Sequence, residues 1–210
     1  MPLSDWPCGD TLPRGPKEGA GPARVLVFDT ETTGLPRHGR VFLPGSRGWP
    51  RLVQAAWVLY EGSGRECGRR SMLVQPSGFT IPKSATAIHG ITTERACRDG
   101  VPLRAVLHAF AQDMAQAHVV VAHNMIFDQG VIAAECWREG FPDPISGKGI
   151  VCTMLASARL AGRSGRVLSL DELYQTLFSC GREGAHDAER DAEACARCFF
   201  ELVRRGDIRV

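Results

Sequence analysis

Two carboxylates stand two residues apart at the end of an apolar run near the start of the chain. The run Val25–Phe28 is apolar and rich in β-branched residues, as in a buried central strand, and Asp29 and Glu31 follow it. Side chains of a strand alternate between its faces, so Asp29 and Glu31 point the same way. Neighbouring carboxylates repel each other unless a cation lies between them. The pair indicates a site for a hard divalent cation such as Mg²⁺ or Mn²⁺, although a strand followed by a polar turn over Thr32–Gly34 would give the same short pattern.

Further acidic residues and a histidine fall where later elements begin. Asp128 opens a predicted helix that follows an apolar strand, and His186, Asp187 and Asp191 lie at the start of the last predicted helix. Asp187 and Asp191 are four residues apart and share a helical face, so either could be a ligand on physical grounds. Four carboxylate positions and one histidine therefore line up at element ends.

Strands and helices alternate in the part of the chain that must position these groups. The first strand begins at Val25, and four more strands are predicted over 52–60, 67–75, 119–122 and 150–153. The predicted helical segments are a short turn within 84–92, then 101–117, 128–139, a helix from the fifth strand through 160, 170–178 and 187–205. Ser169 and Glu172 have the pattern of a capping box. This order predicts an α/β domain with a mixed five-stranded sheet and helices on both faces.

Composition describes an ordinary globular protein. The chain has 210 residues, enough for one well-packed domain, and its 44% hydrophobic and 23% charged residues are typical of soluble proteins. The formal net charge of +2 is too balanced to argue for nucleic-acid binding by bulk charge. A site that binds a polyanion through metal ions does not need a basic protein, so that function stays open.

Targeting signals and disulfide patterns cannot be recognised in the sequence. The N-terminus lacks the basic and apolar regions of a signal peptide, and no apolar run is long enough to span a membrane. The eight cysteines are scattered, so we expect reduced thiols in a cytoplasmic protein. Cys195 and Cys198 have no second Cys/His pair at zinc-like spacing nearby, and we interpret them as packed small side chains.

Two segments lack hydrophobic periodicity. Residues 1–23 are rich in Pro and Gly and are predicted to form a flexible leader, which leaves 24–210 as the domain. The loop 36–50 contains no acidic residue. Its arginines are Arg37, Arg40 and Arg47. A basic flap over a polyanionic substrate is one hypothesis for this loop, and a solvated surface loop is the other.

Four motifs, in order, resemble those of the DEDDh 3′–5′ exonucleases, the group that contains the proofreading epsilon subunit of bacterial DNA polymerase III. They are Phe28–Leu35, Ile88–Thr92, Ala122–Asp128, and His186 with Asp191 five positions on. The match extends from about residue 24 to 205. One such motif would be weak, whereas four in the right order are specific. The resemblance implies a ribonuclease H-like fold for the predicted sheet.

The resemblance also implies roles for the site residues. The family's metal-binding carboxylates correspond to Asp29, Glu31, Asp128 and Asp191, which would bind two Mg²⁺ or Mn²⁺ ions. Asp191 is selected over Asp187 because the histidine lies five residues before it. The ion held by Asp29, Glu31 and Asp191 would acidify the attacking water, and the ion held chiefly by Asp29, with Asp128 nearby, would stabilise the leaving 3′-oxygen. His186 would be the general base, a role suited to an imidazole that titrates near neutrality.

The substrate contacts follow from the same resemblance. Leu35 would wedge against the terminal base, while the backbone near Thr32 and the side chain of His89 would contact the terminal nucleotide and its phosphate. Asn124 would position the turn before Asp128 or touch the substrate. Without the resemblance, Leu35 is a loop leucine and His89 a histidine in a capped turn.

The function predicted from the sequence is a metal-dependent 3′–5′ exonuclease that releases nucleoside 5′-monophosphates from single-stranded or frayed DNA. An RNA-trimming or oligoribonucleotide exonuclease with the same site is one alternative, and a catalytically silent nucleic-acid-binding polymerase accessory module is the other. The chain ends within five residues of the last predicted helix, without a tail that could tether it to a polymerase. This favours a stand-alone nuclease or a subunit that docks through its own surface; a homodimer is a further expectation.

Overall fold

The computed structural model describes residues 23–36, 48–161, 166–182 and 184–209. The predicted leader, apart from residue 23, lies outside the described residues. So do the three arginines of the predicted flap, Arg37, Arg40 and Arg47. The leader and the flap therefore stay predictions.

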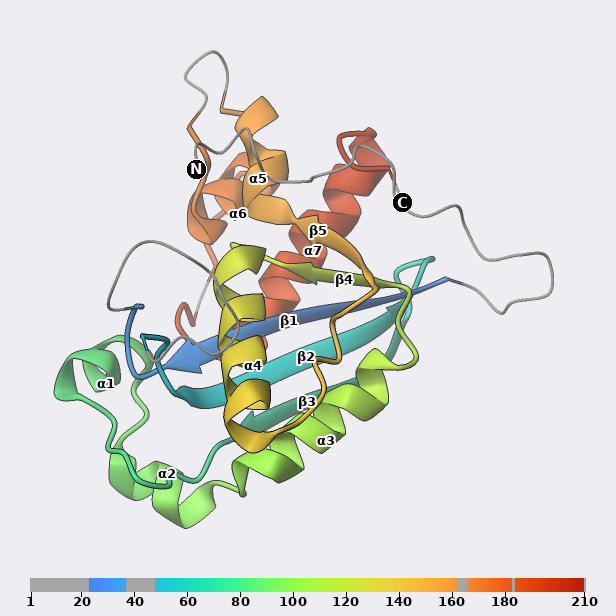
Figure 1. Cartoon of the computed structure of the whole chain (residues 1–210). Helices are drawn as coiled ribbons and strands as arrows, with labels where there is room; N and C mark the ends of the chain where they lie inside the picture. The colour runs from blue at the N-terminus through green and yellow to red at the C-terminus, as the bar shows by residue number, and fades with distance from the viewer. Residues whose placement is uncertain (1–22, 37–47, 162–165, 183, 210) are drawn as a thin grey trace.

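A mixed five-stranded sheet forms the centre of the domain (Figure 1). Its strands are β1 (Arg24–Thr32), β2 (Leu52–Glu61), β3 (Glu66–Leu73), β4 (Val119–Ala122) and β5 (Gly149–Cys152). Their order across the sheet is β3-β2-β1-β4-β5. β1 pairs antiparallel with β2 and parallel with β4, so the antiparallel and parallel halves of the sheet meet at β1. This confirms the predicted architecture.

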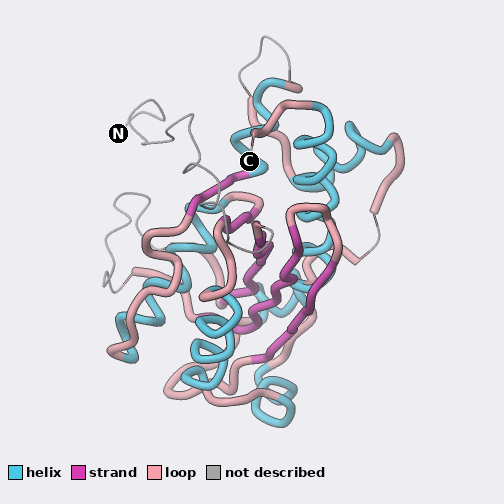
Figure 2. Tube along the Cα trace, turned by 90° about the vertical axis from the view of Figure 1, so that its right-hand side faces the viewer, coloured by secondary structure: helices cyan, strands magenta, loops and turns pink. Residues whose placement is uncertain are grey.

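Helices cover both faces of the sheet, and Figure 2 shows the strands running between them. α3 (Leu103–Met114) and α4 (Met125–Glu139) pack on one face, and α6 (Leu170–Phe178) and α7 (Ala188–Arg205) pack on the other. The remaining helical elements are α1 (Lys83–His89), α2 (Thr93–Asp99), α5 (Thr153–Ala156) and the 3-10 helix η2 (Ser157–Arg159). The predicted capping box is present at α6.

The side chains of β1 divide between the two cores. Leu26 and Phe28 belong to the core under α3 and α4, whereas Val25 and Val27 belong to the core under α6 and α7. Because side chains alternate between the two faces of a strand, the polar residues after the apolar run also point alternately to the two sides of the sheet. Asp29 therefore falls on the α7 side of the sheet, and the strand presents successive polar groups to two different helices.

Several element boundaries differ from the prediction by a few residues. α4 begins at Met125 rather than Asp128, because Asn124 adopts a left-handed conformation (φ 70°) and its carbonyl accepts the Phe127 N–H at 2.8 Å. The helix predicted over 101–117 is shorter, because Val101 bridges to Val74 and the helix starts only after Pro102. The helix predicted through residue 160 divides into α5 and η2.

The predicted turn within 84–92 is the helix α1, and a second short helix, α2, follows it beyond the predicted range. Gly90 ends α1 with φ 72°, a conformation that favours glycine, and the Thr92 side chain caps α2 by accepting the Arg95 N–H.

The cysteines and the helix lengths agree with the sequence-based expectations. The cysteines in the described part of the chain are free thiols, and Cys195 and Cys198 are buried in the core under α7, which confirms their interpretation as packed side chains. No helix among the described residues is both long enough and apolar enough to cross a membrane.

Candidate active site

The carboxyl end of β1 carries three consecutive polar residues. Asp29 and Glu31 lie on the side of the sheet that α7 covers, and Thr30 lies on the side that α4 covers. Glu31 is only 9% exposed. A buried strand thus ends in charged side chains that water reaches poorly, an arrangement that is costly without a compensating cation.

Asp128 reaches this end of the sheet from the first turn of α4. Its Oδ1 accepts two hydrogen bonds from Thr30, one from the backbone N–H at 3.1 Å and one from the hydroxyl at 2.7 Å. The side chain is buried at 3% exposure. Thr30 therefore fixes the position of Asp128 relative to β1, a role that the sequence analysis did not assign.

The start of α7 separates the two aspartates that physical reasoning left open. The Asp187 side chain accepts the backbone N–H groups of Glu189 at 3.1 Å and Arg190 at 3.2 Å, so it is the N-cap of the helix. Asp191 lies one turn further on and is 8% exposed. The backbone N–H of His186 donates to Asp191 Oδ2 at 3.3 Å.

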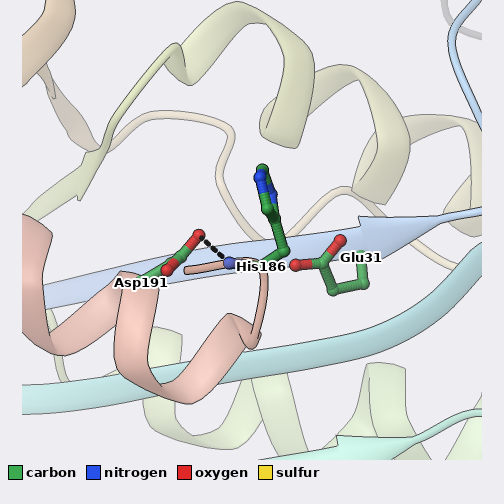
Figure 3. A group of neighbouring side chains, drawn as sticks. All are labelled: Glu31, His186 and Asp191. Carbon is green, nitrogen blue, oxygen red and sulfur yellow. Dashed lines mark hydrogen bonds between the residues drawn. The ribbon is translucent and has the colours of Figure 1, made fainter. Parts of the chain in front are cut away.

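His186 has an uncommon backbone conformation with φ 64°. Non-glycine residues adopt this left-handed region rarely, and such residues gather at functional sites. The conformation turns the chain into α7 while the side chain stays exposed. In Figure 3 the backbone of His186 lies between the carboxylates of Glu31 and Asp191, and the imidazole projects upward from it.

Glu31, His186 and Asp191 form a compact cluster. Each offers one ligand atom, and these atoms all lie within 4.8 Å of one another, a spacing that could hold a metal ion. Asp29 and Asp128 fall outside this triplet. Both are nevertheless close to it, because the charge of Asp128 raises the pKa of Glu31 and the charge of Glu31 raises the pKa of Asp29. The structure thus brings all five predicted catalytic residues to one end of the sheet.

The carboxylates raise one another's pKa. Burial, together with the charges of Asp128, Asp191 and Glu31, raises the pKa of Asp29 well above its usual range. Burial and the charges of Asp191 and Asp128 raise the pKa of Glu31 to about 8. Burial raises the pKa of Asp128 to about 7 despite the hydrogen bonds from Thr30. The cluster carries more negative charge than its protein neighbours neutralise.

Arg182 supplies part of the missing positive charge. Its guanidinium donates to Asp191 Oδ1 and to Asp171, and its side chain is only 8% exposed. It also lowers the pKa of Asp29, against the larger raising effects. Sequence reasoning missed Arg182, since a single arginine in the loop before α7 carries no signal of a partner nine residues away.

His123 is a second residue whose position the sequence did not reveal. Burial lowers its pKa to about 4, so the ring is neutral at neutral pH. Nε2 donates to the carbonyl of Leu168 at 3.1 Å, which leaves Nδ1 to accept the hydroxyl of Thr153 at 3.0 Å. The ring therefore ties the end of β4 to the first residue of α5 and to the segment before α6, and its role is structural.

The predicted substrate contacts, Thr32, Leu35, His89 and Asn124, all lie within the described residues. Burial lowers the pKa of His89, whose Nε2 lies 3.3 Å from the carbonyl of Thr32 and whose Nδ1 accepts the Ile91 N–H. Leu35 is 79% exposed beyond the end of β1. Asn124 makes no side-chain capping hydrogen bond, and its left-handed backbone starts the helix that carries Asp128. Thr32 and His89 thus contact each other, while Asn124 acts on the turn that leads into α4.

The donor set fits hard divalent cations. Carboxylate oxygens are the ligands that Mg²⁺ and Mn²⁺ prefer, and here they are close together, with pKa values raised by burial and by mutual repulsion. A bound cation would lower those pKa values and remove the repulsion. Without a bound cation, the repulsion between these carboxylates would destabilise the folded protein.

Comparison with known proteins agrees with this chemistry. Residues 26–199 match the exonuclease family whose profile is named RNase_T. The chain belongs to this exonuclease family. Among curated relatives, a DNA polymerase III subunit epsilon-like protein of Rhodobacter capsulatus is 33% identical over 182 residues, which is 85% of this chain and 23% of that protein. The PolC-type DNA polymerase III of Streptococcus sanguinis is 32% identical over 183 residues, 87% of this chain and 11% of that protein. The exonuclease chain therefore spans less than a quarter of these relatives.

Solved structures share the fold of this exonuclease chain. The zinc-bound complex of Escherichia coli exonuclease I with single-stranded DNA superposes with a TM-score of 0.70 at 18% identity, covering 88% of this chain and 41% of that one. Exonuclease I from Methylocaldum szegediense gives a TM-score of 0.68 at 19% identity, covering 87% of this chain and 41% of that one. At these identities the likeness establishes the fold, which is ribonuclease H-like as the motifs predicted.

Proposed function

We propose that this chain is a DEDDh-type 3′–5′ exonuclease that uses two divalent metal ions to release nucleoside 5′-monophosphates from DNA 3′ ends. The observation that carries the proposal is the convergence of four carboxylates on one end of the sheet, with a negative charge that Arg182 only partly offsets. Asp29, Glu31, Asp128 and Asp191 are the proposed metal ligands. Membership of the exonuclease family supports the reaction class.

The metal ions supply the positive charge and the acidified water that phosphodiester hydrolysis requires. The protein contributes the frame that holds the ligands. Thr30 orients Asp128, the strand places Asp29 and Glu31 on one side, and α7 presents Asp191 from its first turn. Mg²⁺ and Mn²⁺ both suit this set of oxygen donors.

His186 is the proposed general base. Its side chain is exposed beside Glu31 and Asp191, where an attacking water would lose its proton. Asp191 accepts the backbone N–H of His186, which couples the position of the imidazole to the metal ligand. Loss of the ring should therefore slow turnover more than it weakens binding.

DNA is the proposed substrate because the relatives are named as DNA polymerase III proteins and one structural neighbour is a complex with single-stranded DNA. Thr32, Leu35 and His89 are the proposed contacts to the terminal nucleotide, with Asn124 setting the turn before Asp128. Association with a polymerase is a further proposal, because this chain corresponds to only part of each relative.

The test is gel analysis of a 5′-labelled single-stranded DNA incubated with the protein and Mg²⁺ or Mn²⁺, with EDTA in a parallel reaction. The expected result is a ladder that shortens from the 3′ end only when metal is present. Asp29→Asn should abolish the ladder. Asp99→Asn is the matched control, since that carboxylate is 41% exposed at the end of α2 and pairs with Arg98.

Three outcomes would contradict the proposal. Shortening of a matched RNA strand alone would favour the RNA-trimming alternative. An intact band with both nucleic acids, from protein that retains its fold, would favour a silent binding module, and substantial activity of Asp29→Asn would count against the two-metal site.

A further inference from the structure

A pocket of about 470 Å³ opens next to the proposed active site, where four segments of the chain meet. It lies between the end of β1, the start of β2, the segment before α1 and the carboxyl end of α4. Its principal walls are formed by Leu35, Trp49, Arg51, Phe79, Trp137 and Arg138. None of its described lining residues is acidic, in contrast to the cluster of carboxylates nearby.

The pocket presents aromatic surface to solvent. Trp137 lies on the last turn of α4 and is 58% exposed, an unusual state for the largest apolar side chain. Trp49 is buried against the same helix, where its ring lies over Gly130 and 6.3 Å from the Phe127 ring centroid. One tryptophan is thus fixed in the wall, and the other offers a face on which a planar group could stack.

The pocket also carries surplus positive charge. Arg51 and Arg138 both pair with the buried carboxylate of Glu135, at 2.9 and 3.1 Å. Two guanidinium groups therefore share one carboxylate, which leaves a net charge of one positive unit at this wall. Arg51 also lies over the Phe79 ring, 4.3 Å from its centroid, so its orientation is held on two sides.

The pocket is continuous with the proposed path of the substrate. Thr33 and Leu35 form its rim, and Thr33 is joined to Arg51 by two hydrogen bonds of 2.9 Å. Thr32 and His89, the other proposed contacts of the terminal nucleotide, are not among its described lining residues. Leu35 therefore stands between the proposed terminal-nucleotide site and this pocket.

We propose that the pocket is a second nucleotide subsite, which binds an inner nucleotide of the single strand whose 3′ end lies at the carboxylates. The base stacks on Trp137, and Arg51 and Arg138 face the backbone phosphate. Aromatic stacking accepts any base, and a guanidinium pair recognises a phosphate without reading sequence. The inference rests on the proposed function, since it takes the strand to be the substrate of that site.

Binding is measured first, in a way that does not depend on cleavage. Fluorescence anisotropy would give the Kd of a labelled single-stranded thymidine oligonucleotide with Mg²⁺, in an Asp29→Asn background. Adding Trp137→Ala should raise the Kd roughly tenfold, as expected for one lost stacking contact. Trp137→Phe should stay close to the parent, because it keeps an aromatic face.

A charge-matched pair separates local from general effects. Trp137→Glu places a negative charge beside the proposed phosphate and should weaken binding more than Trp137→Ala. Gln175→Glu adds the same charge on an exposed position of α6, on the other face of the sheet, and should leave the Kd unchanged. Trp137 is exposed, so its substitutions should not disturb folding.

Hydrolysis of the p-nitrophenyl ester of thymidine 5′-monophosphate isolates the catalytic site, because this substrate has no inner nucleotide. Trp137→Ala should hydrolyse it as the wild type does. An unchanged Kd for Trp137→Ala and Trp137→Glu would overturn the second subsite. If Trp137→Ala lost activity on the ester to the same extent as it lost affinity for the oligonucleotide, the second subsite would also be overturned, because the pocket would then bind the terminal nucleotide. Failure of the wild type on the ester would contradict the proposed function instead, and the anisotropy result would still decide the subsite.

Discussion

Three carboxylates of the site are positioned by different interactions. Asp128 is fixed by two hydrogen bonds from Thr30, whereas Asp191 has a direct cationic partner in Arg182. Glu31 is positioned by the strand β1, and the charges of Asp191 and Asp128 raise its pKa. Arg182 is therefore the internal cation of the site, and a metal ion at Asp191 would take over part of its role.

Replacing Arg182 with Met should lower the free energy of unfolding in EDTA by about 3 kcal/mol. The substitution keeps the length of the side chain and leaves Asp191 as a buried charge without its partner. Saturating Mn²⁺ should reduce the deficit to less than about 1 kcal/mol, because the ion neutralises the same carboxylate. Urea unfolding with and without metal would measure both values.

Arg204→Met is the control for this prediction. Arg204 is 72% exposed and pairs with Glu201 on the surface of α7, so its removal should cost less than about 1 kcal/mol with or without metal. If Arg182→Met were equally destabilising in Mn²⁺ and EDTA, Arg182 would have a structural role unrelated to the charge of the metal site.

At the scale of elements, the first turn of α7 assigns different tasks to two similar residues. Asp187→Asn should keep its helix cap and nearly all activity, because asparagine caps as well as aspartate. Asp191→Asn should lower turnover about 10²–10³-fold, as expected when a group that stabilises charge at the reacting centre is lost. Steady-state rates on single-stranded DNA would compare the two.

Asp187→Ala completes this comparison. Its loss of the cap should lower the free energy of unfolding by about 1 kcal/mol while the metal site stays intact. A strong loss of activity in Asp187→Asn, with normal stability, would make Asp187 rather than Asp191 the fourth ligand.

The contact between α4 and Trp49 reverses an ordinary helix preference. Gly130→Ala would stabilise a typical helix by about 0.8–1.0 kcal/mol. Here the added methyl group would overlap the Trp49 ring, so the substitution should destabilise the protein by about 1–3 kcal/mol. In a Trp49→Leu background the effect of Gly130→Ala should regain its stabilising sign, which a double-mutant cycle of thermal unfolding would measure. A stabilising effect in the wild-type background would show that the ring is not held against Gly130.

For the whole molecule, the sequence was most informative where one element determines the geometry. Strand alternation placed Asp29 and Glu31 on one side, and the capping box of α6 followed from Ser169 and Glu172. Family resemblance added the order of the motifs. Features that depend on contacts between distant segments were not visible, because no local pattern encodes the partner.

Arg182 and the aromatic pocket are the clearest examples of such features. The pairing of Arg182 with Asp191 requires the loop before α7 to fold back over the helix start. The pocket needs segments that are far apart in the chain, with Leu35, Phe79 and Trp137 brought together only by the sheet and α4. The sequence also does not predict the start of α4 at Met125, because no local pattern indicates the left-handed backbone conformation of Asn124.

The raised pKa values make the stability of the whole molecule depend jointly on pH and metal. Without metal, the folded protein holds a proton on Glu31 up to a pKa of about 8, whereas the unfolded chain releases it near 4.5. Asp128, with a pKa of about 7, behaves in the same way. Because the folded state binds more protons over this interval, the contribution of these two groups to the free energy of unfolding is largest at acid pH and is lost as pH rises toward 8.

Divalent metal should remove this pH dependence, since it binds the deprotonated carboxylates and competes with the protons. At pH 8.5, Mn²⁺ at about 100 times its Kd should raise the Tm by roughly 5–10 °C over EDTA, and at pH 5.5 the rise should be much smaller. Differential scanning calorimetry of the wild type and Glu31→Gln would test this, because the amide cannot ionise and should lessen the loss of stability at high pH in EDTA. A metal-induced rise in Tm that is equal at both pH values would mean that the metal does not bind at these carboxylates, since only there do protons and cations compete for the same oxygens.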